Sequence, residues 1–434
     1  MLYRNILNKI SVAALVVAVP AAGQEVETSA HEEPVRTIPA MAGPDAKMVI
    51  KGMNAFSLDL YRHTLDAQKN HFLSPASVSV ALGMVYRGAR GVTASELEKT
   101  LHFGKPPREY LRANGQVLDT MSITGPRREL LTANAVWLQT GLQLLPDFEQ
   151  ELTTFAKAGL QRVDFQRSAN AARLRVNGWV AELTRNKIND LLNPGDVTDR
   201  TRSILVNAIY WKGAWANEFS KNQTKLDRFT PLAGDRVIVP LMRQQSDFQV
   251  MERDGIKAIL LPYVGDEVEM AVFLPNAAKG LPNFEKKLTT DLLANLLRDL
   301  ANTKLRATIL TMPKMRVEWR ENLSTSLKAM GAPTAFSSDA DFSGIATFPI
   351  PGADPSETGL KFTHVVHKTF LEVDETGSEA AAATAILAVA ITAARQAPPP
   401  PPPFVFRADK PFFFLLRDRR TGLILFMGRY VKPT

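Results

Sequence analysis

Cysteine is absent from the 434 residues of this chain. Its absence excludes a disulfide scaffold, a zinc-finger array and a cysteine nucleophile, and it suits an oxidising compartment. The motifs GxSxG, HExxH and GxxxxGK[ST] are also absent, as is a GxGxxG followed by a helix. Without a nucleophile elbow, a zinc-binding helix or a phosphate-binding loop, an enzyme is the weaker hypothesis.

Histidine is scarce, with six residues in the whole chain. His364 and His367 are close in sequence, but positions three apart on a strand point to opposite faces of the sheet. The two imidazoles therefore do not suit a shared metal site. No acid/base pair stands out either, and we expect neither a metal ion nor a cofactor.

Dense basic runs with interleaved aromatic residues, which are typical of nucleic-acid-binding segments, are missing. The formal net charge of +8 arises from 52 basic and 44 acidic residues, a mild excess for this length. The densest basic stretch, Arg417 to Arg420, lies between two apolar runs and is expected at a hairpin tip. We expect no nucleic-acid partner.

The N-terminus has the features of a secretory signal. Arg4 precedes an apolar stretch, Ile10 to Val19, that is too short for a stable membrane-spanning helix. Ala21 and Gly23 supply the small residues of a cleavage site. This pattern predicts a signal peptide over residues 1–23 and a secreted protein, periplasmic or extracellular; an uncleaved anchor is the alternative.

The next segment, residues 24–47, is rich in Glu, Pro, Ala and Thr and is expected to be a disordered leader. No later window reaches the roughly 18 apolar residues of a membrane helix. We therefore expect the mature protein not to span a membrane.

Hydrophobic residues make up 45% of the chain and charged residues 22%, as in a soluble globular protein. Length alone suggests two or three domains. Thr93 and Glu96 form a capping box that predicts a helix start near Thr93. Helical spacing occurs at Met53, Phe56 and Leu60; at Val176, Trp179, Val180 and Leu183; and at Leu323, Leu327 and Met330.

Short runs of β-branched and apolar residues predict strands. They lie at Ser203–Trp211, Ala258–Leu261, Met270–Leu274 and Leu305–Val317, and a C-terminal hairpin joins Phe412–Leu416 to Leu423–Met427. Helices and strands do not alternate as βαβ units, which favours the α+β class.

The segment 372–395, EVDETGSEAAAATAILAVAITAAR, is unusual. Helix propensity favours a helix over Ala380 to Ala385. Alternate residues from Ser378 onward are small, however, and a strand with such a face can slide between two strands without steric conflict. A mobile surface helix and an insertable strand both remain open at this point. Pro398 to Pro403, which follow, form a polyproline II rod that suits an exposed connector.

Six stretches of the chain, taken in order, resemble the serpin family. They are Asn70–Phe103 (NHFLSPASVSVALGMVYRGARGVTASELEKTLHF), Asn177–Leu192 (NGWVAELTRNKINDLL), Leu205–Trp215 (LVNAIYWKGAW), Asp341–Ile345 (DFSGI), Val373–Ala385 (VDETGSEAAAATA) and Phe406–Asp418 (FRADKPFFFLLRD). The resemblance runs from about Met48 to Thr434. Each stretch is moderately specific alone, and their order is very specific.

The resemblance implies one domain, residues 48–434, with three β-sheets, eight or nine helices and an exposed reactive loop at about residues 375–405. It also implies a mechanism in which a serine protease cuts the loop and is trapped while the loop inserts into the main sheet. Insertion of Gly377 to Ile391, at about 3.3 Å per residue, would carry the attached protease roughly 50 Å.

The family's functional residues can be matched to this chain. The hinge is matched by Glu375, Gly377, Ser378, Glu379, Ala380, Ala381, Ala382 and Ala383. Its small-residue run is intact, which favours inhibition. The polar cluster beneath the sheet is matched by Ser74, Ser77, Asn207 and His367, and the aromatic residue where the loop enters by Trp215. Ordinary hydrogen bonding and core packing are the alternatives for these five residues.

Counting along the loop as in the family places the cleaved bond at Ile391–Thr392. The small aliphatic residues Ala388 to Ile391 predict an elastase-like or subtilisin-like protease. Arg395 is a rival site that would suit a trypsin-like protease, and a cut there would favour substrate behaviour over trapping. The proline run makes this loop longer than in common members of the family.

These features favour a monomeric suicide inhibitor that forms a covalent complex with a serine protease. A non-inhibitory serpin that acts as a carrier or chaperone-like binding protein is the alternative.

Overall fold

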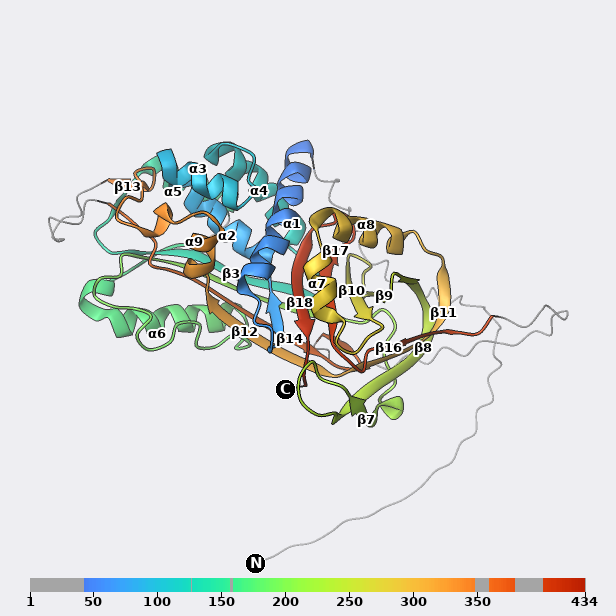
Figure 1. Cartoon of the computed structure of the whole chain (residues 1–434). Coiled ribbons are helices and arrows are strands. Elements are labelled where there is room, and N and C mark those ends of the chain that lie inside the picture. The colour runs from blue at the N-terminus through green and yellow to red at the C-terminus, as the bar shows by residue number, and fades with distance from the viewer. Residues whose placement is uncertain (1–42, 126, 157–158, 348–358, 379–400, 434) are drawn as a thin grey trace, which may run out of the picture. The chain divides into compact units, whose positions relative to one another are not determined.

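A computed structural model describes residues 43–125, 127–156, 159–347, 359–378 and 401–433 (Figure 1). These residues form three β-sheets and nine α-helices, which confirms the predicted α+β architecture. The helices are α1 (Pro44–Thr64), α2 (Pro75–Gly88), α3 (Gly91–Thr100), α4 (Pro107–Met121), α5 (Pro146–Glu151), α6 (Phe165–Leu183), α7 (Leu281–Lys287), α8 (Thr290–Ala301) and α9 (Ser324–Met330).

A seven-stranded sheet has the order β12-β14-β6-β3-β2, with β15 paired to β6 and β5 paired to β3. The strands are β12 (Met315–Asn322), β14 (His364–Val373), β6 (Ser203–Ala214), β3 (Arg128–Gln139), β2 (Thr124–Gly125), β15 (Gly377–Ser378) and β5 (Gly159–Val163). The two central strands, β14 and β6, run parallel and pair directly from His364↔Ile204 to Phe370↔Tyr210. We call the line between them the β6/β14 seam.

A nine-stranded sheet has the order β1-β18-β17-β10-β9-β8-β11-β16, with β7 paired to β8. The strands are β1 (His71–Leu73), β18 (Ile424–Tyr430), β17 (Phe412–Asp418), β10 (Val268–Pro275), β9 (Ile256–Pro262), β8 (Val237–Arg253), β11 (Leu305–Pro313), β16 (Phe404–Arg407) and β7 (Lys225–Phe229). A third sheet pairs β13 (Ala346–Thr347) with β4 (Gln143–Leu144).

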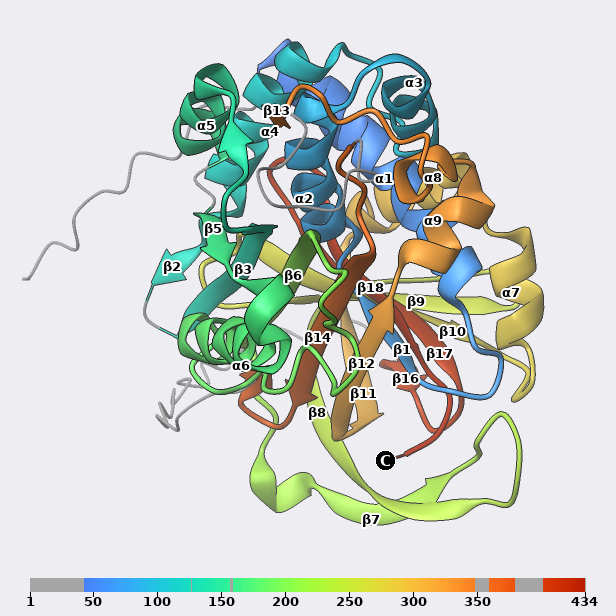
Figure 2. The same ribbon diagram turned by 90° about the vertical axis from the view of Figure 1, so that its left-hand side faces the viewer.

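The seven-stranded sheet is buried on both faces, which explains why β6 reads as an almost continuous apolar run. On one face, Val176 and Val180 of α6 lie in one hydrophobic cluster with Tyr210 and Val366. The other face packs in a core with α1 to α4 and the nine-stranded sheet. Figure 1 shows α6 on one side of the sheet and α1 to α4 on the other, and Figure 2 shows α6 in front of it.

Helix α1 begins at Pro44, so the expected boundary between a leader over residues 24–47 and a folded part from residue 48 is wrong by four residues. Proline is favoured in the first helical turn. Ala46 is fully buried, and Asp45 forms an ion pair with Lys105 at 2.9 Å. These contacts hold the first turn of the helix on the folded core.

Helix α3 begins at Gly91 and has no side-chain cap at its N-terminus, so the predicted capping box is wrong. The backbone N–H of Asp341 donates to Thr93 Oγ1 at 2.9 Å. The backbone N–H and the hydroxyl of Thr334 donate to the Glu96 carboxylate at 2.9 and 2.8 Å. Both side chains therefore bind the segment that follows α9. Each has a partner that is distant in sequence and does not cap α3.

The single strand predicted over Leu305–Val317 is two strands of different sheets, since β11 ends at Pro313 and β12 begins at Met315. Proline lacks the N–H that would continue a ladder. The predicted C-terminal hairpin is confirmed as β17 and β18.

Acidic partners neutralise the basic stretch at the tip of this hairpin. Arg417 Nε donates to the Glu269 carboxylate at 2.6 Å, and Arg420 Nη2 donates to Asp418 at 2.6 Å. The stretch is therefore an ion-pair network rather than a free basic surface.

Candidate functional site

Three polar side chains lie in one row across the centre of the seven-stranded sheet. Asn134 on β3 lies opposite Asn207 on β6, which lies opposite His367 on β14. Asn207 Nδ2 donates to Asn134 Oδ1 at 2.6 Å. We call these three residues the polar row; it crosses the β6/β14 seam.

The N-terminus of α2 lies beneath the polar row and provides two serine side chains. Ser74 caps the helix, and its backbone N–H donates to His367 Nε2 at 3.0 Å. Ser77 Oγ accepts a hydrogen bond from Asn207 Nδ2 at 2.6 Å. All four residues predicted for this cluster, Ser74, Ser77, Asn207 and His367, are brought together and are fully buried.

Burial lowers the pKa of His367 to about 3, so the imidazole is neutral near pH 7. A neutral ring is required by the geometry, because Nε2 accepts the hydrogen bond from Ser74. The row is not fully satisfied: the buried Asn207 Oδ1 has no hydrogen-bond partner among the described residues. A buried acceptor without a partner raises the free energy of this state.

The strand that pairs with β6 changes from β14 to β15 at the upper end of the seam. Pairing between β14 and β6 stops at Phe370↔Tyr210, and β15 then pairs antiparallel with β6, Gly377 opposite Ala214 and Ser378 opposite Gly213. The first residues of the expected exposed loop, 375–378, are thus buried and bound to the sheet, so the expected start of exposure at residue 375 is wrong.

Glycine is required at position 377. Its φ is 152°, in a region that side chains with a Cβ rarely adopt, and a Cβ there would lie 2.1 Å from the carbonyl oxygen of Gly213. The close approach of the two backbones explains why β15 can pair with β6 here.

A tight turn leads into β15. The Asp374 carboxylate accepts hydrogen bonds from the backbone N–H and hydroxyl of Thr376, at 2.8 and 2.7 Å, and from the N–H of Gly377 at 3.1 Å. Trp215 Nε1 donates to the carbonyl of Asp374 at 3.0 Å, and the N–H of Trp215 donates to that of Thr376 at 2.9 Å. Trp215 therefore binds the turn where the sequence placed the loop's point of insertion.

Glu375 is buried within an ionic contact. Its Oε1 accepts a hydrogen bond from Thr224 Oγ1 at 2.7 Å and forms an ion pair with Lys314 Nζ at 2.8 Å. Burial acts to raise the pKa of Glu375, but the hydrogen bonds from Lys314 and Thr224 outweigh it and leave the pKa below its usual value. The carboxylate stays ionised and fixes the chain just before β15.

Ser378 is fully buried, and its hydroxyl is 2.7 Å from the hydroxyl of Tyr263. The ring of Tyr263 stacks on Trp215 with 4.4 Å between centroids. The side chain of Ser378 thus occupies a closed space on the face of the sheet that also carries Trp211.

The remaining predicted site residues lie outside the described residues. They are the rest of the hinge, Glu379, Ala380, Ala381, Ala382 and Ala383, and the candidate cleavage sites Ile391, Thr392 and Arg395.

Five residues of the site were not predicted: Asn134, Thr224, Tyr263, Lys314 and Asp374. A polar residue within the apolar run of β3 was a usable signal for Asn134. Asp374, next to the hinge motif, could have been read as a turn residue. The other three lie beside strands that are distant in sequence, Thr224 before β7, Tyr263 after β9 and Lys314 between β11 and β12, and no local pattern marks them.

Within the described residues, no group of three or more His, Asp or Glu side chains could hold a metal ion. No described helix is long and apolar enough to cross a membrane.

Comparison with known proteins gives a consistent result. A family model described as Serpin (serine protease inhibitor) matches residues 51–433. A serpin-like protein of Thermococcus kodakarensis is 35% identical over 89% of this chain and 86% of its own length. Human Serpin B3 is 32% identical over 87% of this chain and 97% of its own.

Three solved structures are also similar to this chain, and the sequence of each is 26% identical to it. Uncleaved ovalbumin has a TM-score of 0.77 and covers 89% of this chain and 100% of its own. Arabidopsis AtSerpin1, described as being in a native stressed conformation, has a TM-score of 0.77, and human thyroxine-binding globulin complexed with thyroxine 0.76; each covers 90% of this chain and 100% of its own.

Proposed function

The chain belongs to the serpin family, and on this premise we propose that it is an irreversible suicide inhibitor of serine endopeptidases. Members of this family are protease inhibitors rather than enzymes, although some do not inhibit. The observation that carries the proposal is the pairing of Gly377 and Ser378 with β6. The first two residues of an inserting strand already lie at the top of the seam.

The register of β15 gives the path of the remaining residues. If pairing continues downward, Thr384 comes to lie opposite Asn207, and Ala388 opposite Ser203, the first residue of β6. Directly opposed residues in an antiparallel pair share a face. Asn207 points toward Ser77 of α2, so Thr384 would point there too.

Thr384 would complete the polar row. Its hydroxyl can donate to Asn207 Oδ1, the buried acceptor that has no partner while the seam is closed. The uncut molecule therefore holds an unsatisfied acceptor that the inserted strand would satisfy. This is a specific physical reason for the inserted state to be lower in free energy.

The side chains of the loop suit both faces of the sheet. Of the residues that share the face of Ser378, Ala380, Ala382 and Thr384 are small, and Ile386, which would lie opposite Leu205, is apolar, so all can enter the core beneath the sheet. Glu379 would lie on the opposite face, across from Lys212, where an opposite-charge pair forms. No residue between 379 and 388 places an unpaired charge in the core.

The energetics favour insertion only after the loop is cut. At a net ~0.5–1.5 kcal/mol per hydrogen bond, a strand bonded along both edges from residue 379 to 388 stabilises the cut form by on the order of 10 kcal/mol. The cut at Ile391–Thr392 frees the strand's lower end. A protease still acylated at Ile391 is then pulled along, and a displacement of ~1 Å in its catalytic groups can slow deacylation about 100-fold.

The test is a denaturing gel of the protein mixed with pancreatic elastase and, separately, with subtilisin and trypsin. We expect a covalent band that survives boiling with elastase or subtilisin, and a released peptide whose mass matches the 43 residues Thr392–Thr434. A released peptide that begins at Gln396 would place the cleaved bond at Arg395–Gln396 instead. Cleavage without any covalent band would reject the inhibitory mechanism.

A carrier or chaperone-like serpin is the second candidate, favoured by the similarity to thyroxine-binding globulin. The same gel separates the two functions, because a carrier is cleaved without trapping its protease.

We further propose that residues 1–23 are removed on secretion and that the mature protein is a monomer. N-terminal sequencing of the exported protein, with Gln24 as the expected first residue, and sedimentation of the mature form test these two points.

A further inference from the structure

Strand β16, with which the chain returns from the loop to the sheet, is an edge strand. It pairs with β11 on one side and has no neighbour on the other side among the described residues. The open side of an edge strand presents unpaired backbone N–H and C=O groups, to which a strand of another molecule can add. The edge of β16 is therefore a place at which two copies of this chain could join.

The loop contains a segment that suits such an addition. Ile386 to Thr392 (ILAVAIT), which we call the reactive segment, is uncharged, rich in β-branched residues and free of Pro and Gly. This composition is typical of segments that add to open edges or pair with copies of themselves. The proposed function requires the same composition, because the segment must enter a sheet. A segment that serves inhibition in one molecule thus favours association between two.

The prolines that precede β16 remove donors from this edge. Pro398 to Pro403 carry no N–H, and Pro401 and Pro402, which the structure describes, are exposed. Pairing with β11 begins at Phe404. Two further residues of the same register would place Pro402 opposite Arg306, but a proline lacks the donor that the ladder needs. The ladder therefore stops at Phe404.

The side chain of Arg306 takes the place of the missing ladder bond. Its Nη2 donates to the carbonyl oxygen of Pro402 at 3.4 Å. The same guanidinium lies over the ring of Phe404, with 5.3 Å between Cζ and the ring centroid. Arg306 therefore fixes the last prolines and the first residue of β16 on β11.

The side chain of Lys257 covers part of the open edge. The backbone N–H of Ala408 donates to Thr311 of β11 at 2.8 Å, so Val405, three residues earlier, turns its carbonyl away from β11. Lys257 Nζ donates to this carbonyl at 3.0 Å. The ammonium also lies 5.3 Å from the centroid of the buried Phe404 ring. The acceptor on the open edge of β16 is thus occupied by a cation.

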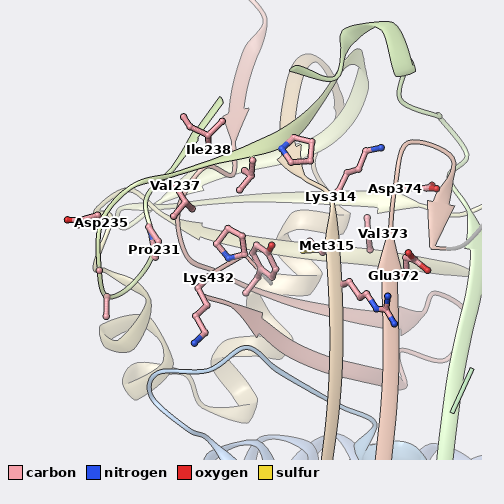
Figure 3. Close-up of a pocket in the computed structure, with 17 residues that line it drawn as sticks. Pro231, Asp235, Val237, Ile238, Lys314, Met315, Glu372, Val373, Asp374 and Lys432 are labelled. Carbon is pink, nitrogen blue, oxygen red and sulfur yellow. The ribbon is translucent and has the colours of Figure 1, made fainter. Parts of the chain in front are cut away.

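The opposite edge of this part of the sheet is limited in a similar way. Leu241 of β8 pairs with β7 on one side and with β11 on the other, so β7 and β16 are the outer strands of four. Strand β7 is five residues long and carries Lys225 and Asp227. Figure 3 shows Pro231 and Asp235 in the connection that follows it. Both edges combine charge with nearby proline, which opposes pairing between sheet edges.

We propose that Pro401–Pro403, Lys257 and Arg306 form a protected edge, which prevents the reactive segment of a second copy from adding to β16. An incoming strand finds no donor on the prolines, and it must displace the ammonium of Lys257 to reach the carbonyl of Val405. The displaced ammonium would lose its acceptor beside a buried ring, which costs free energy. The protected edge acts in the uncut molecule and involves no protease, so it can hold or fail independently of the proposed function.

Sedimentation of the uncut mature protein after mild heating tests the protected edge. The variant replaces the three described prolines by strand-forming residues and removes the lysine: Pro401→Thr, Pro402→Val, Pro403→Thr and Lys257→Ala. We expect the parent to stay monomeric and the variant to associate at least about tenfold more tightly. Association of the parent, or a variant that stays as monomeric as the parent, overturns the protected edge.

Two further variants control for folding and for charge. Lys257→Gln keeps the prolines and should also associate more than the parent, so it decides the question if the larger variant does not fold. Lys279→Ala removes an exposed lysine from the connection between β10 and α7 and should leave the protein monomeric. Equal association of these two variants would show an effect of net charge alone and would overturn the role of Lys257.

The identity of the added strand is tested by placing Leu387→Lys and Val389→Lys in the variant with four substitutions. Charges within the reactive segment should restore the monomer. Amide hydrogen exchange locates the contact: in the associated form it should slow at Val405, on the open edge, and stay unchanged in β7. Association that the two lysines leave unchanged, or slower exchange in β7 instead of β16, overturns the addition of the reactive segment to β16.

Discussion

The β6/β14 seam and the C-terminal hairpin are both central pairings, but they are built differently. Strands β17 and β18 are antiparallel neighbours in which buried Phe and Leu residues dominate, and Arg429 Nε is the one buried side-chain polar atom on either strand that lacks a partner among the described residues. Strands β6 and β14 are parallel and pair directly with each other, and the polar row crosses both of them. Four such atoms lie on β6 and β14 in the same part of the chain: Asn207 Oδ1, Tyr210 Oη, Trp211 Nε1 and His367 Nδ1.

The difference indicates which of the two pairings would persist when the loop inserts. Separation of β17 from β18 would break hydrogen bonds without allowing new ones, since β17 already pairs with a strand on each side, β18 and β10. The seam holds an acceptor without a donor and a glycine-based start of another strand at its upper end. On this account, the hairpin is the permanent core, while the seam is closed only until a better strand is free to enter.

The largest effect is expected from Ser378→Arg, which breaks the seam's ability to accept the loop. Ser378 fills a closed space against Tyr263, and burial of an unpaired guanidinium there costs several kcal/mol. The variant should be cut by elastase as a substrate, with the covalent band reduced by a factor of about ten or more.

The control for this variant is Ser378→Ala, which fits the same space and should still trap protease. Equal trapping by parent and Ser378→Arg would show that the hinge does not enter the sheet.

Phe414→Ala tests the permanent half of the comparison. Phe414 is fully buried on β17 and stacks on Phe72 with 5.8 Å between centroids. Removal of the ring should lower the free energy of unfolding by about 3–5 kcal/mol. The loss should be the same before and after cleavage of the loop. A loss confined to one of the two forms would mean that the hairpin takes part in the transition.

Acid should weaken the seam. The pKa of His367 is about 3 in the folded state because of burial, and that of His71 is also about 3, through burial and the nearby charge of Arg429. Unfolded histidine has a pKa near 6.5, so below about pH 6.5 the unfolded state binds protons that the folded state does not. Stability is therefore full above that pH and falls toward pH 3, by up to about 1.4 kcal/mol per pH unit for each histidine.

Urea titrations between pH 7 and pH 4 measure this slope. His367→Gln should make the slope shallower, while His71 and His364, whose pKa values burial also lowers, retain the rest of it. An unchanged slope in the variant would place the acid sensitivity elsewhere.

The smallest effect is expected from Thr384→Val, which keeps the volume of the side chain and removes its hydroxyl. The uncut protein should be unaffected. The cut form should lose about 1–2 kcal/mol, because Asn207 Oδ1 stays without a partner. The increase in melting temperature on cleavage measures this loss, with Thr384→Ser as a control that retains the hydroxyl. If cleavage raises the melting temperature of the valine variant as much as that of the parent, the hydroxyl of Thr384 does not bind Asn207.

Much of the site could be predicted from the sequence because its residues lie in recognisable stretches. Ser74 caps an apolar helix, Ser77 lies in its first turn, and Asn207 interrupts an apolar strand. Resemblance, rather than periodicity, assigned them to one cluster. The α+β class followed from the lack of βαβ alternation, and the resemblance implied the fold with three sheets.

The parts that sequence could not give depend on distant partners. Glu96 matches a capping box, yet it binds Thr334 far along the chain. The burial of Ser378 depends on the hydroxyl of Tyr263 and on the register with Gly213. Local patterns carry no information on such contacts, which are set by how the two large sheets pack.

The most direct test of the account is a crystal structure of the protein after cleavage of the loop. The account predicts a new strand between β6 and β14, antiparallel to both, with Thr384 opposite Asn207 and the hydroxyl of Thr384 within hydrogen-bond distance of Asn207 Oδ1. A cleaved molecule in which His364–Phe370 still pair directly with Ile204–Tyr210 would contradict it.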